Sequence, residues 1–341
     1  MRNSSILIEN PGVVRIVESP LPVRQKGQVL LKLLYGGICG SDLGSYRGTF
    51  AYFDYPRIPG HEFSAEIVEC DEDNAYGLKK GMVVTGNPYF NCGKCYSCQR
   101  GLVNACTSNE TLGCQRDGAF STYFVMPEER IYDGKGIDAK TLAAIEPFCI
   151  GYHGAKRASL KPGDKVLVVG AGTIGVVTAI SAKLMGAEVT ICDVAPAKLE
   201  MAKGFGVDHV LLNDNPDTFL DKVNSLTDGN GFDAAFEAVG MPSTMMNCID
   251  AVCFGGQVVD IGVGKKNLDF NYTIIQKKEL NIYGSRNARK EDFLELIDLV
   301  ASGKVDISKL ITNVFNFEDA ATAFAEFSAH AGEMLKVMIQ F

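Results

Sequence analysis

Hydrophobic and polar positions divide the chain into two parts with different patterns. In the first 150 residues, short apolar runs such as Gln28–Leu34, Glu62–Val68 and Met82–Thr85 alternate with segments that contain Gly and Pro. Apolar runs of this length between turn residues are typical of β-strands. This part is therefore predicted to form a mostly β domain with long connecting loops.

A turn sequence at Lys161–Asp164 (KPGD) begins the second part, in which strand-like and helix-like runs alternate. The predicted strands are Lys165–Val169, Glu188–Cys192, His209–Leu212, Asp233–Val239, Gln257–Ile261 and Glu279–Tyr283. The predicted helices between them include Thr173–Met185, Pro196–Gly204 and Pro216–Thr227. Strands that are apolar almost throughout and alternate with helices predict an α/β fold, with a doubly wound parallel sheet covered on both faces.

The remaining elements belong to a short C-terminal segment. They are two amphipathic helices, Glu291–Ser302 and Phe317–Ser328, and a final strand, Met334–Phe341. Because this segment is too short for a third domain, we expect it to fold back onto the first. The predicted organisation is a mostly β domain of residues 1–150 and 286–341 and an α/β domain of residues 151–285.

Composition excludes several classes of protein. Of the 341 residues, 46% are hydrophobic and 22% are charged, which is ordinary for a globular protein and unlike a disordered or fibrous one. The net charge of −8 argues against nucleic acid or an anionic membrane as a partner. The most apolar stretch, Val166–Ala182, is shorter than the roughly 20 residues of a membrane span and is interrupted by glycines. Composition alone leaves the kind of partner open.

A glycine motif follows the first strand of the α/β part. Gly170, Gly172 and Gly175, together with Ala171, Thr173 and Ile174, form G-x-G-x-x-G at the start of a predicted helix, and Asp193 ends the next strand. This arrangement is typical of a dinucleotide site, in which the helix N-terminus binds the pyrophosphate and the acid binds the ribose hydroxyls. The acid would repel a 2′-phosphate, so NAD is favoured over NADP. A glycine-rich turn without a ligand is the alternative.

The eleven cysteines need an explanation other than disulfides. Their number is odd, and Met1–Ser5 does not open an export signal, so we expect a cytoplasmic protein with reduced thiols. Four of them, Cys92, Cys95, Cys98 and Cys106, stand in a C-x2-C-x2-C-x7-C array. Four thiolates can close a tetrahedral zinc site with no open position, which is a structural site. Loop cysteines without a metal, or a redox pair, are the alternatives.

A second group of candidate ligands is dispersed along the chain. Cys39 precedes Ser41, His61 precedes Glu62 in a glycine-flanked segment, and Glu146 lies near the predicted domain junction. A single Cys or His is more often part of a core than a ligand. The spacing of these residues therefore leaves open whether they form a site.

The motifs GICGSD, PGHE, the four-cysteine loop, IEP and VLVVGAGTIG occur in this order and together resemble those of the zinc-dependent medium-chain dehydrogenases. The resemblance extends over essentially the whole chain. Glu146 in AAIEPF is similar to the polyol (sorbitol-type) branch, and FDYPRIPGHE and GSRNARKEDF resemble relatives that act on sugar acids such as L-galactonate or L-gulonate. The family implies a GroES-like catalytic domain, a Rossmann domain, two zinc ions and a homodimer or homotetramer.

The resemblance also implies roles for individual residues. Cys39 and His61 would bind a catalytic zinc, and Glu62 and Glu146 would complete its shell directly or through water. Ser41 would relay the proton, and Asp42 would orient the His61 ring. Contacts to the cofactor are implied for Lys198, for Val239 and Gly240, and for Gly262 and Val263.

One position departs from the family. Many relatives end the proton relay at a histidine five residues after the zinc cysteine, and here that residue is Gly44.

Arg286 could bind a substrate carboxylate, or instead contact the cofactor or polyol hydroxyls.

The expected reaction is reversible oxidation of a secondary alcohol of a sugar acid or polyol by NAD. A sorbitol, threonine or simple alcohol dehydrogenase is an alternative substrate class. The non-enzyme alternatives are an NAD-binding sensor and a zinc-ribbon adaptor. The sensor would not need Cys39, Ser41 and His61 together, and the adaptor leaves the glycine motif unexplained.

Overall fold

The computed structural model describes residues 2–341, which divide into two compact units. The first unit contains residues up to Glu146 and Ala288–Phe341, and the second contains Pro147–Asn287. The domains expected from the sequence, residues 1–150 with 286–341 and residues 151–285, stay a prediction. No helix in the described part of the chain combines the length and apolar character needed to cross a membrane.

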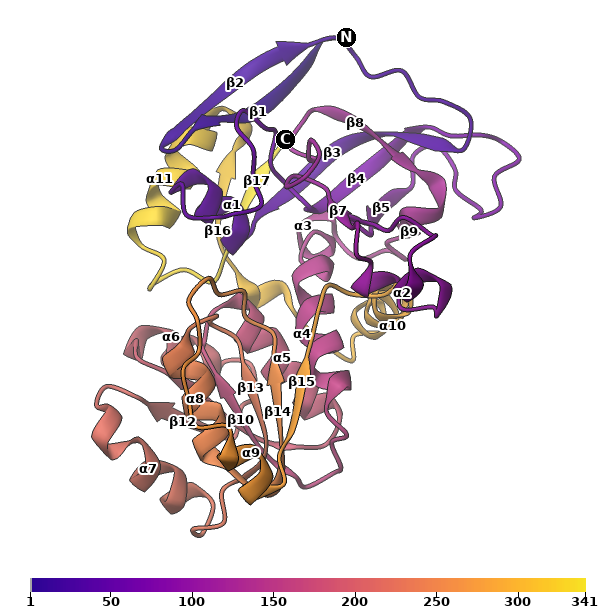
Figure 1. Cartoon of the computed structure of the whole chain (residues 1–341). Coiled ribbons are helices and arrows are strands. Elements are labelled where there is room, and N and C mark those ends of the chain that lie inside the picture. The colour runs from indigo at the N-terminus through magenta and orange to yellow at the C-terminus, as the bar shows by residue number, and fades with distance from the viewer. Residues whose placement is uncertain (1) are drawn as a thin grey trace. The chain divides into compact units, whose positions relative to one another are not determined.

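A seven-stranded mixed sheet forms the centre of the first unit (Figure 1). Its strands are, in spatial order, β16 (Ile311–Asn316), β17 (Lys336–Gln340), β3 (Gln28–Ile38), β4 (Glu62–Glu69), β5 (Val83–Gly86) and β9 (Ile131–Asp133), with β8 (Tyr123–Pro127) also paired to β3. The C-terminal strand β17 pairs antiparallel with β3, so the end of the chain is part of the same sheet as its beginning. The sheet core includes Leu31, Phe63 and Phe324, which are fully buried.

The first unit also contains two pairs of strands outside the main sheet and several helices. Two further antiparallel pairs are β1 (Asn3–Asn10) with β2 (Val13–Ser19) and β6 (Tyr89–Phe90) with β7 (Glu110–Thr111). The helices are α1 (Gly40–Tyr46), α2 (Tyr96–Gln99), α3 (Ala139–Leu142), α10 (Lys290–Ala301) and α11 (Ala320–Ala329), and α4 (Ile145–Arg157) begins here and continues into the second unit. The predicted helix at Phe317–Ser328 starts as a 3₁₀ turn over Phe317–Asp319.

The second unit is a six-stranded sheet in which every pair of neighbouring strands is parallel. In spatial order the strands are β12 (His209–Leu212), β11 (Glu188–Asp193), β10 (Lys165–Val169), β13 (Phe232–Glu237), β14 (Val252–Asp260) and β15 (Asn281–Gly284). The order reverses between β10 and β13, which is the arrangement of doubly wound nucleotide-binding sheets. The predicted α/β fold class is confirmed.

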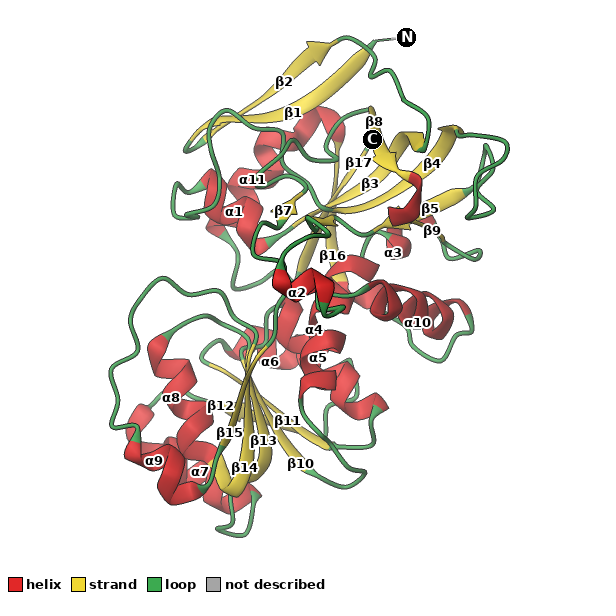
Figure 2. Cartoon of the chain, turned by 45° about the vertical axis from the view of Figure 1, so that its right-hand side comes forward, coloured by secondary structure: helices red, strands yellow, loops and turns green. Residues whose placement is uncertain are grey.

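Helices cover both faces of this sheet (Figure 2). They are α5 (Thr173–Leu184), α6 (Pro196–Lys203), α7 (Phe219–Leu226), α8 (Pro242–Ala251) and α9 (Thr273–Lys278), together with the part of α4 that lies beyond Glu146. One buried cluster joins α7, α8 and α9 to strand residues such as Leu167 and Val258. Because the central strand β10 is covered on both sides, it is apolar over Val166–Val169, which made it visible in the sequence.

Candidate metal and dinucleotide sites

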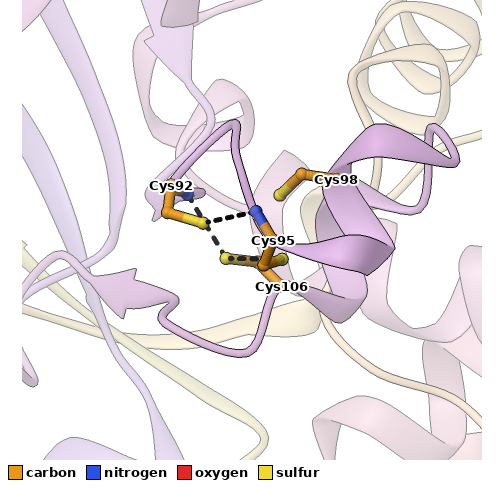
Figure 3. Close-up of side chains that lie close together, drawn as sticks. All are labelled: Cys92, Cys95, Cys98 and Cys106. Atoms are coloured by element: carbon orange, nitrogen blue, oxygen red, sulfur yellow. Dashed lines mark hydrogen bonds between the residues drawn. The ribbon is translucent and has the colours of Figure 1, made fainter.

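Four cysteines come together in the loop between β6 and β7. Cys92 follows β6, Cys95 and Cys98 lie at the start of and within α2, and Cys106 follows a 3₁₀ turn. The four Sγ atoms all lie within 4.8 Å of one another. Figure 3 shows the four side chains directed toward one region, with Cys98 entering from α2.

Backbone N–H groups surround these sulfur atoms. The N–H of Cys92 and that of Ser108 both donate to Cys106 Sγ at 3.3 Å, and the N–H of Cys95 donates to Cys92 Sγ at 3.3 Å. Hydrogen bonds from the N–H groups of Cys98 and Thr107 lower the pKa of Cys95 to about 5. Such donors favour thiolates, which are the form that binds metal. The donor set therefore fits a closed tetrahedral zinc site.

A second cluster lies at one end of the seven-stranded sheet. Cys39 comes directly after β3, and His61 and Glu62 lie at the start of β4. Antiparallel pairing places Gly37 opposite Glu62, and one ligand atom from each of Cys39, His61 and Glu62 lies within 4.8 Å of the others. A Cβ added at Gly37 would lie 2.1 Å from Glu62 Oε2, so the close approach of the two strands needs glycine here.

The charges in this cluster are buried and only partly compensated. Burial lowers the pKa of His61, but the charges of Asp42 and Cys39 outweigh it, so that the pKa lies well above its usual value. Asp42 Oδ2 accepts a hydrogen bond of 2.9 Å from the Cys39 N–H, and its Oδ1 lies 3.9 Å from His61 Nδ1, beyond hydrogen-bond distance. In the described part of the chain, His61 Nδ1 and Glu62 Oε2 are buried with no hydrogen-bond partner. A thiolate, an imidazole and a carboxylate oxygen around one point fit a divalent zinc ion.

Lys336 is a residue of this site that the sequence analysis missed. Its Nζ lies 2.7 Å from Glu62 Oε1 and donates to the Ile38 carbonyl oxygen at 3.3 Å. The side chains of Lys336 and Glu62 are 3% and 0% exposed. Burial alone would lower the pKa of Lys336, but the nearby charges of Glu62 and Cys39 raise it. The available signal was a lysine at the start of an otherwise apolar final strand, VMI.

Glu146 lies near the cluster but is not one of the three grouped ligands. It is the second residue of α4 and is 2% exposed. Burial raises its pKa to about 7, with a further raising effect from Glu62. Its Oε1 accepts a hydrogen bond from the Tyr89 hydroxyl, a partner that the sequence analysis also missed. The direct or water-mediated role expected for Glu146 stays a prediction.

The glycine motif lies in the loop between β10 and α5 of the second unit. Gly170 has a φ of +105°, which favours glycine, and a Cβ at Gly175 would lie 1.7 Å from the Gly170 carbonyl oxygen. A Cβ at Gly172 would meet only Lys198 Nζ, at 3.7 Å. Gly170 and Gly175 are therefore required by the turn and by packing, whereas space remains at Gly172 at the N-terminus of α5, where Thr173 and Ile174 begin the helix.

Asp193 and Lys198 lie next to this loop. The Asp193 carboxylate accepts hydrogen bonds from the N–H groups of Ala171, at 2.7 Å, and Ala195, at 2.9 Å. The pKa of Lys198 is lowered by burial, against the opposing charge of Asp193. The structure therefore brings together the glycine loop, the acid that ends β11 and the lysine of α6.

Two more loops meet at the same edge of the sheet. A Cβ at Gly240 would lie 2.7 Å from the Val263 carbonyl carbon, so the loop with Val239 and the loop with Gly262 pack closely. The buried carboxylate of Glu237, which the sequence analysis did not name, accepts hydrogen bonds from the N–H groups of Val239 and Gly240 at 2.9–3.0 Å. Arg286 follows β15 and is exposed.

A doubly wound sheet with a glycine loop, a four-thiol cluster and a largely buried Cys–His–Glu cluster together define a zinc-binding dehydrogenase. Residues 173–302 match the family described as "Zinc-binding dehydrogenase", and residues 25–135 match "Alcohol dehydrogenase GroES-like domain". The chain belongs to the zinc-dependent medium-chain dehydrogenases, in the group that resembles polyol dehydrogenases, as the sequence motifs indicated.

Individual relatives match over the full length of the chain. L-galactonate-5-dehydrogenase of Escherichia coli K12 is 34% identical, with 100% of both chains covered. A sorbitol dehydrogenase of Halalkalibacterium halodurans is 32% identical, with 96% of each covered. The structure of an Escherichia coli CFT073 protein described as a short chain alcohol dehydrogenase, solved with NADH, superimposes with a TM-score of 0.90 at 31% identity, covering 100% of this chain and 99% of that one.

Proposed function

We propose that this dehydrogenase transfers a hydride between NAD and a secondary alcohol of a sugar acid or polyol. The observation that carries the proposal is the cluster of half-buried Cys39 with buried His61 and Glu62, in a chain that also has the glycine loop. The similarity to an L-galactonate and a sorbitol dehydrogenase supports this substrate class.

In this proposal, Cys39 and His61 hold the catalytic zinc, and Glu62 and Glu146 supply carboxylate oxygens beside it. Bound zinc supplies a Lewis acid for the alcohol oxygen, and bound NAD supplies the hydride acceptor. The four-cysteine cluster holds a second, structural zinc.

Ser41 is the proposed first acceptor of the substrate hydroxyl proton. It lies two residues after Cys39 in the first turn of α1 and is half-buried. A relay through the position of Gly44 is not available, because glycine has no side chain and an added Cβ would lie 3.2 Å from Phe50 Cβ. We therefore expect the proton to leave through the ribose hydroxyl and ordered water, or through a glutamate-bound water.

Asp193 is the proposed determinant of NAD preference. Its carboxylate lies beside the glycine loop, where it accepts the Ala171 N–H, and it would repel a 2′-phosphate. Replacing Asp193 by Ala should weaken NAD binding about 10- to 100-fold, the size expected for a hydrogen bond to a charged group, and weaken NADP much less. Equal losses for both cofactors would contradict the assignment.

The metal role is tested by counting zinc in two matched cysteine variants. Cys39→Ala should lose one of two zinc ions and all detectable turnover, while the four-cysteine zinc stays. Cys70→Ala, which removes a half-buried thiol of the same unit whose partner is the Leu78 carbonyl oxygen, should keep both ions and full activity. Full activity of Cys39→Ala would refute the proposed site.

Arg286 is the proposed contact for a substrate carboxylate, which a guanidinium can bind through two hydrogen bonds. A panel of aldonates, polyols and simple alcohols with wild type and Arg286→Met tests this role. The variant should raise KM for aldonates far more than KM for polyols. Equal effects would assign Arg286 to the cofactor or to polyol hydroxyls instead.

We also propose that the protein forms a homodimer or homotetramer through strand β15. This strand is the edge of the six-stranded sheet, with Ile282 exposed on it and Phe254 of β14 68% exposed nearby. An exposed edge strand offers unpaired backbone groups to a second strand. Sedimentation should show an oligomer that Ile282→Lys dissociates, and a monomeric wild type would refute this interface.

The thiol chemistry supports a reducing compartment, for which we propose the cytoplasm. No disulfide joins the cysteines within residues 2–341, and a four-thiolate metal cluster needs reduced sulfur. Recovery of the native protein in a fraction other than the cytoplasmic one would refute this assignment.

A further inference from the structure

Tyr89 and Glu146 form a buried hydrogen-bonded pair close to the charges of His61 and Glu62. Tyr89 and Glu146 are 7% and 2% exposed, and the Tyr89 hydroxyl donates a hydrogen bond to Glu146 Oε1. The charged neighbours of Glu146 are His61, Glu62 and Lys336. A hydrogen bond to one oxygen fixes the direction of the other, which is how outer partners orient ligands around a metal.

Tyr89 is itself held by Arg130, which directly precedes β9 and lies outside the four-cysteine loop. Its carbonyl oxygen accepts a hydrogen bond from Arg130 Nη1, and Arg130 Nη2 donates to Asn91 Oδ1 at 2.9 Å. The Arg130 guanidinium also lies 4.6 Å from the centre of the Phe90 ring. Arg130 thus contacts three consecutive residues that directly precede Cys92.

The same series of contacts continues into the cysteine cluster. Asn91 Nδ2 lies 3.9 Å from Cys98 Sγ, within the range of an N–H···S hydrogen bond. None of residues 91–101 is buried, so this segment has no hydrophobic core of its own. A metal bound by the four thiolates would therefore add a constraint, beside the contacts of Arg130, on the start of the loop that follows Tyr89.

We propose that Tyr89 is a positioning residue that orients Glu146 at the catalytic metal site, and that the four-cysteine loop acts on this site through Tyr89. Two sites linked in this way are coupled, so that metal at one raises the affinity for metal at the other. The inference rests on the proposed function, because it takes the cluster of Cys39, His61 and Glu62 as the second metal site.

Tyr89→Phe tests whether Tyr89 orients Glu146, because this change removes only the hydroxyl. The affinity of the catalytic site for zinc, measured by competition with a chelator, should fall about 10- to 100-fold, and the four-cysteine zinc should stay. With cobalt in the catalytic site, the visible absorption spectrum should change. The value of kcat should fall while KM for NAD does not, because the glycine loop lies in the other unit.

Tyr55→Phe is the matched control. The Tyr55 hydroxyl also donates a hydrogen bond, but to the Ser45 carbonyl oxygen and not to a carboxylate. This variant should keep the zinc affinity, the cobalt spectrum and the activity of the wild type. If Tyr89→Phe behaves like this control, Tyr89 does not position Glu146 and the inference is wrong.

Asn91→Ala tests whether the four-cysteine loop acts through Tyr89, since it removes both the contact with Cys98 and the hydrogen bond from Arg130. It should weaken catalytic-site zinc, and the double variant with Tyr89→Phe should lose no more than Tyr89→Phe alone, because both changes act through one path. Additive losses would refute the coupling. A wild type that binds only the four-cysteine zinc would instead refute the proposed function, so the two failures are distinguishable.

Discussion

Replacing Lys336 by methionine removes the cation from a buried ion pair and leaves the aliphatic part of the side chain nearly unchanged. Lys336 Nζ and Glu62 Oε1 are 2.7 Å apart. At an effective dielectric constant of about 20, that separation corresponds to an attraction of about 6 kcal/mol. Part of this is offset because the ammonium group no longer has to be buried. We therefore expect the metal-free protein to lose about 3–5 kcal/mol of unfolding free energy, the usual effect of leaving one buried charge alone.

Urea denaturation of the wild type, Lys336→Met and the double variant Glu62→Gln/Lys336→Met, each with chelator and with excess zinc, measures this effect. The double variant should recover most of the loss, because no unpaired carboxylate remains. Excess zinc should also reduce the deficit of Lys336→Met, since a cation bound beside Glu62 compensates its charge. A loss below about 1 kcal/mol, or a double variant as unstable as Lys336→Met, would refute the reasoning.

Three further predictions concern the glycine loop, an acidic residue and the metal. Gly175→Ala places a Cβ 1.7 Å from the Gly170 carbonyl oxygen and should lower the unfolding free energy by at least about 1–3 kcal/mol, whereas Gly172→Ala should keep the fold and weaken only NADH binding followed by fluorescence. Partial burial raises the pKa of Asp208, but hydrogen bonds from Lys183 and a backbone N–H outweigh it, so the pKa lies below its ordinary value of 3.8. The stabilisation is therefore present above that value and lost as pH falls, and in acid denaturation the wild type should lose more stability than Asp208→Asn below about pH 4. Chelation strong enough to remove both zinc ions should unfold the four-cysteine loop and raise its susceptibility to proteolysis, and equal cleavage rates with and without zinc would contradict a structural metal.

The elements of the second unit were the easiest to predict. The strands at Lys165–Val169 and His209–Leu212 match the structure residue for residue. The first is buried on both faces and is therefore apolar over Val166–Val169, whereas the second is a short edge strand with three consecutive apolar residues. In the first unit the strands have one polar face or are short, and β16 and the long helix α4 were not identified. The apolar positions of α4 are interrupted by Glu146, Pro147 and two glycines, which hid its helical period.

The sequence by itself determined the local constellations of this protein. The glycine motif and the four-cysteine array each lie within fifteen residues, so the spacing of the chain brings their groups together whatever the rest of the fold does. These two motifs indicated a nucleotide site and a structural zinc site, and GICGSD, PGHE and IEP were also needed for the resemblance to the zinc dehydrogenases.

Only the tertiary structure decided which side chains hold the buried carboxylates of Glu62 and Glu146. Lys336 reaches Glu62 across 274 positions of sequence, and Tyr89 reaches Glu146 across 57. The first contact depends on the pairing of β17 with β3 and of β3 with β4, and the second on where the cysteine loop places β6. Sheet register and loop placement result from packing of the whole unit, and a shift of one residue would turn these side chains to the other face. No local pattern in the chain carries that information.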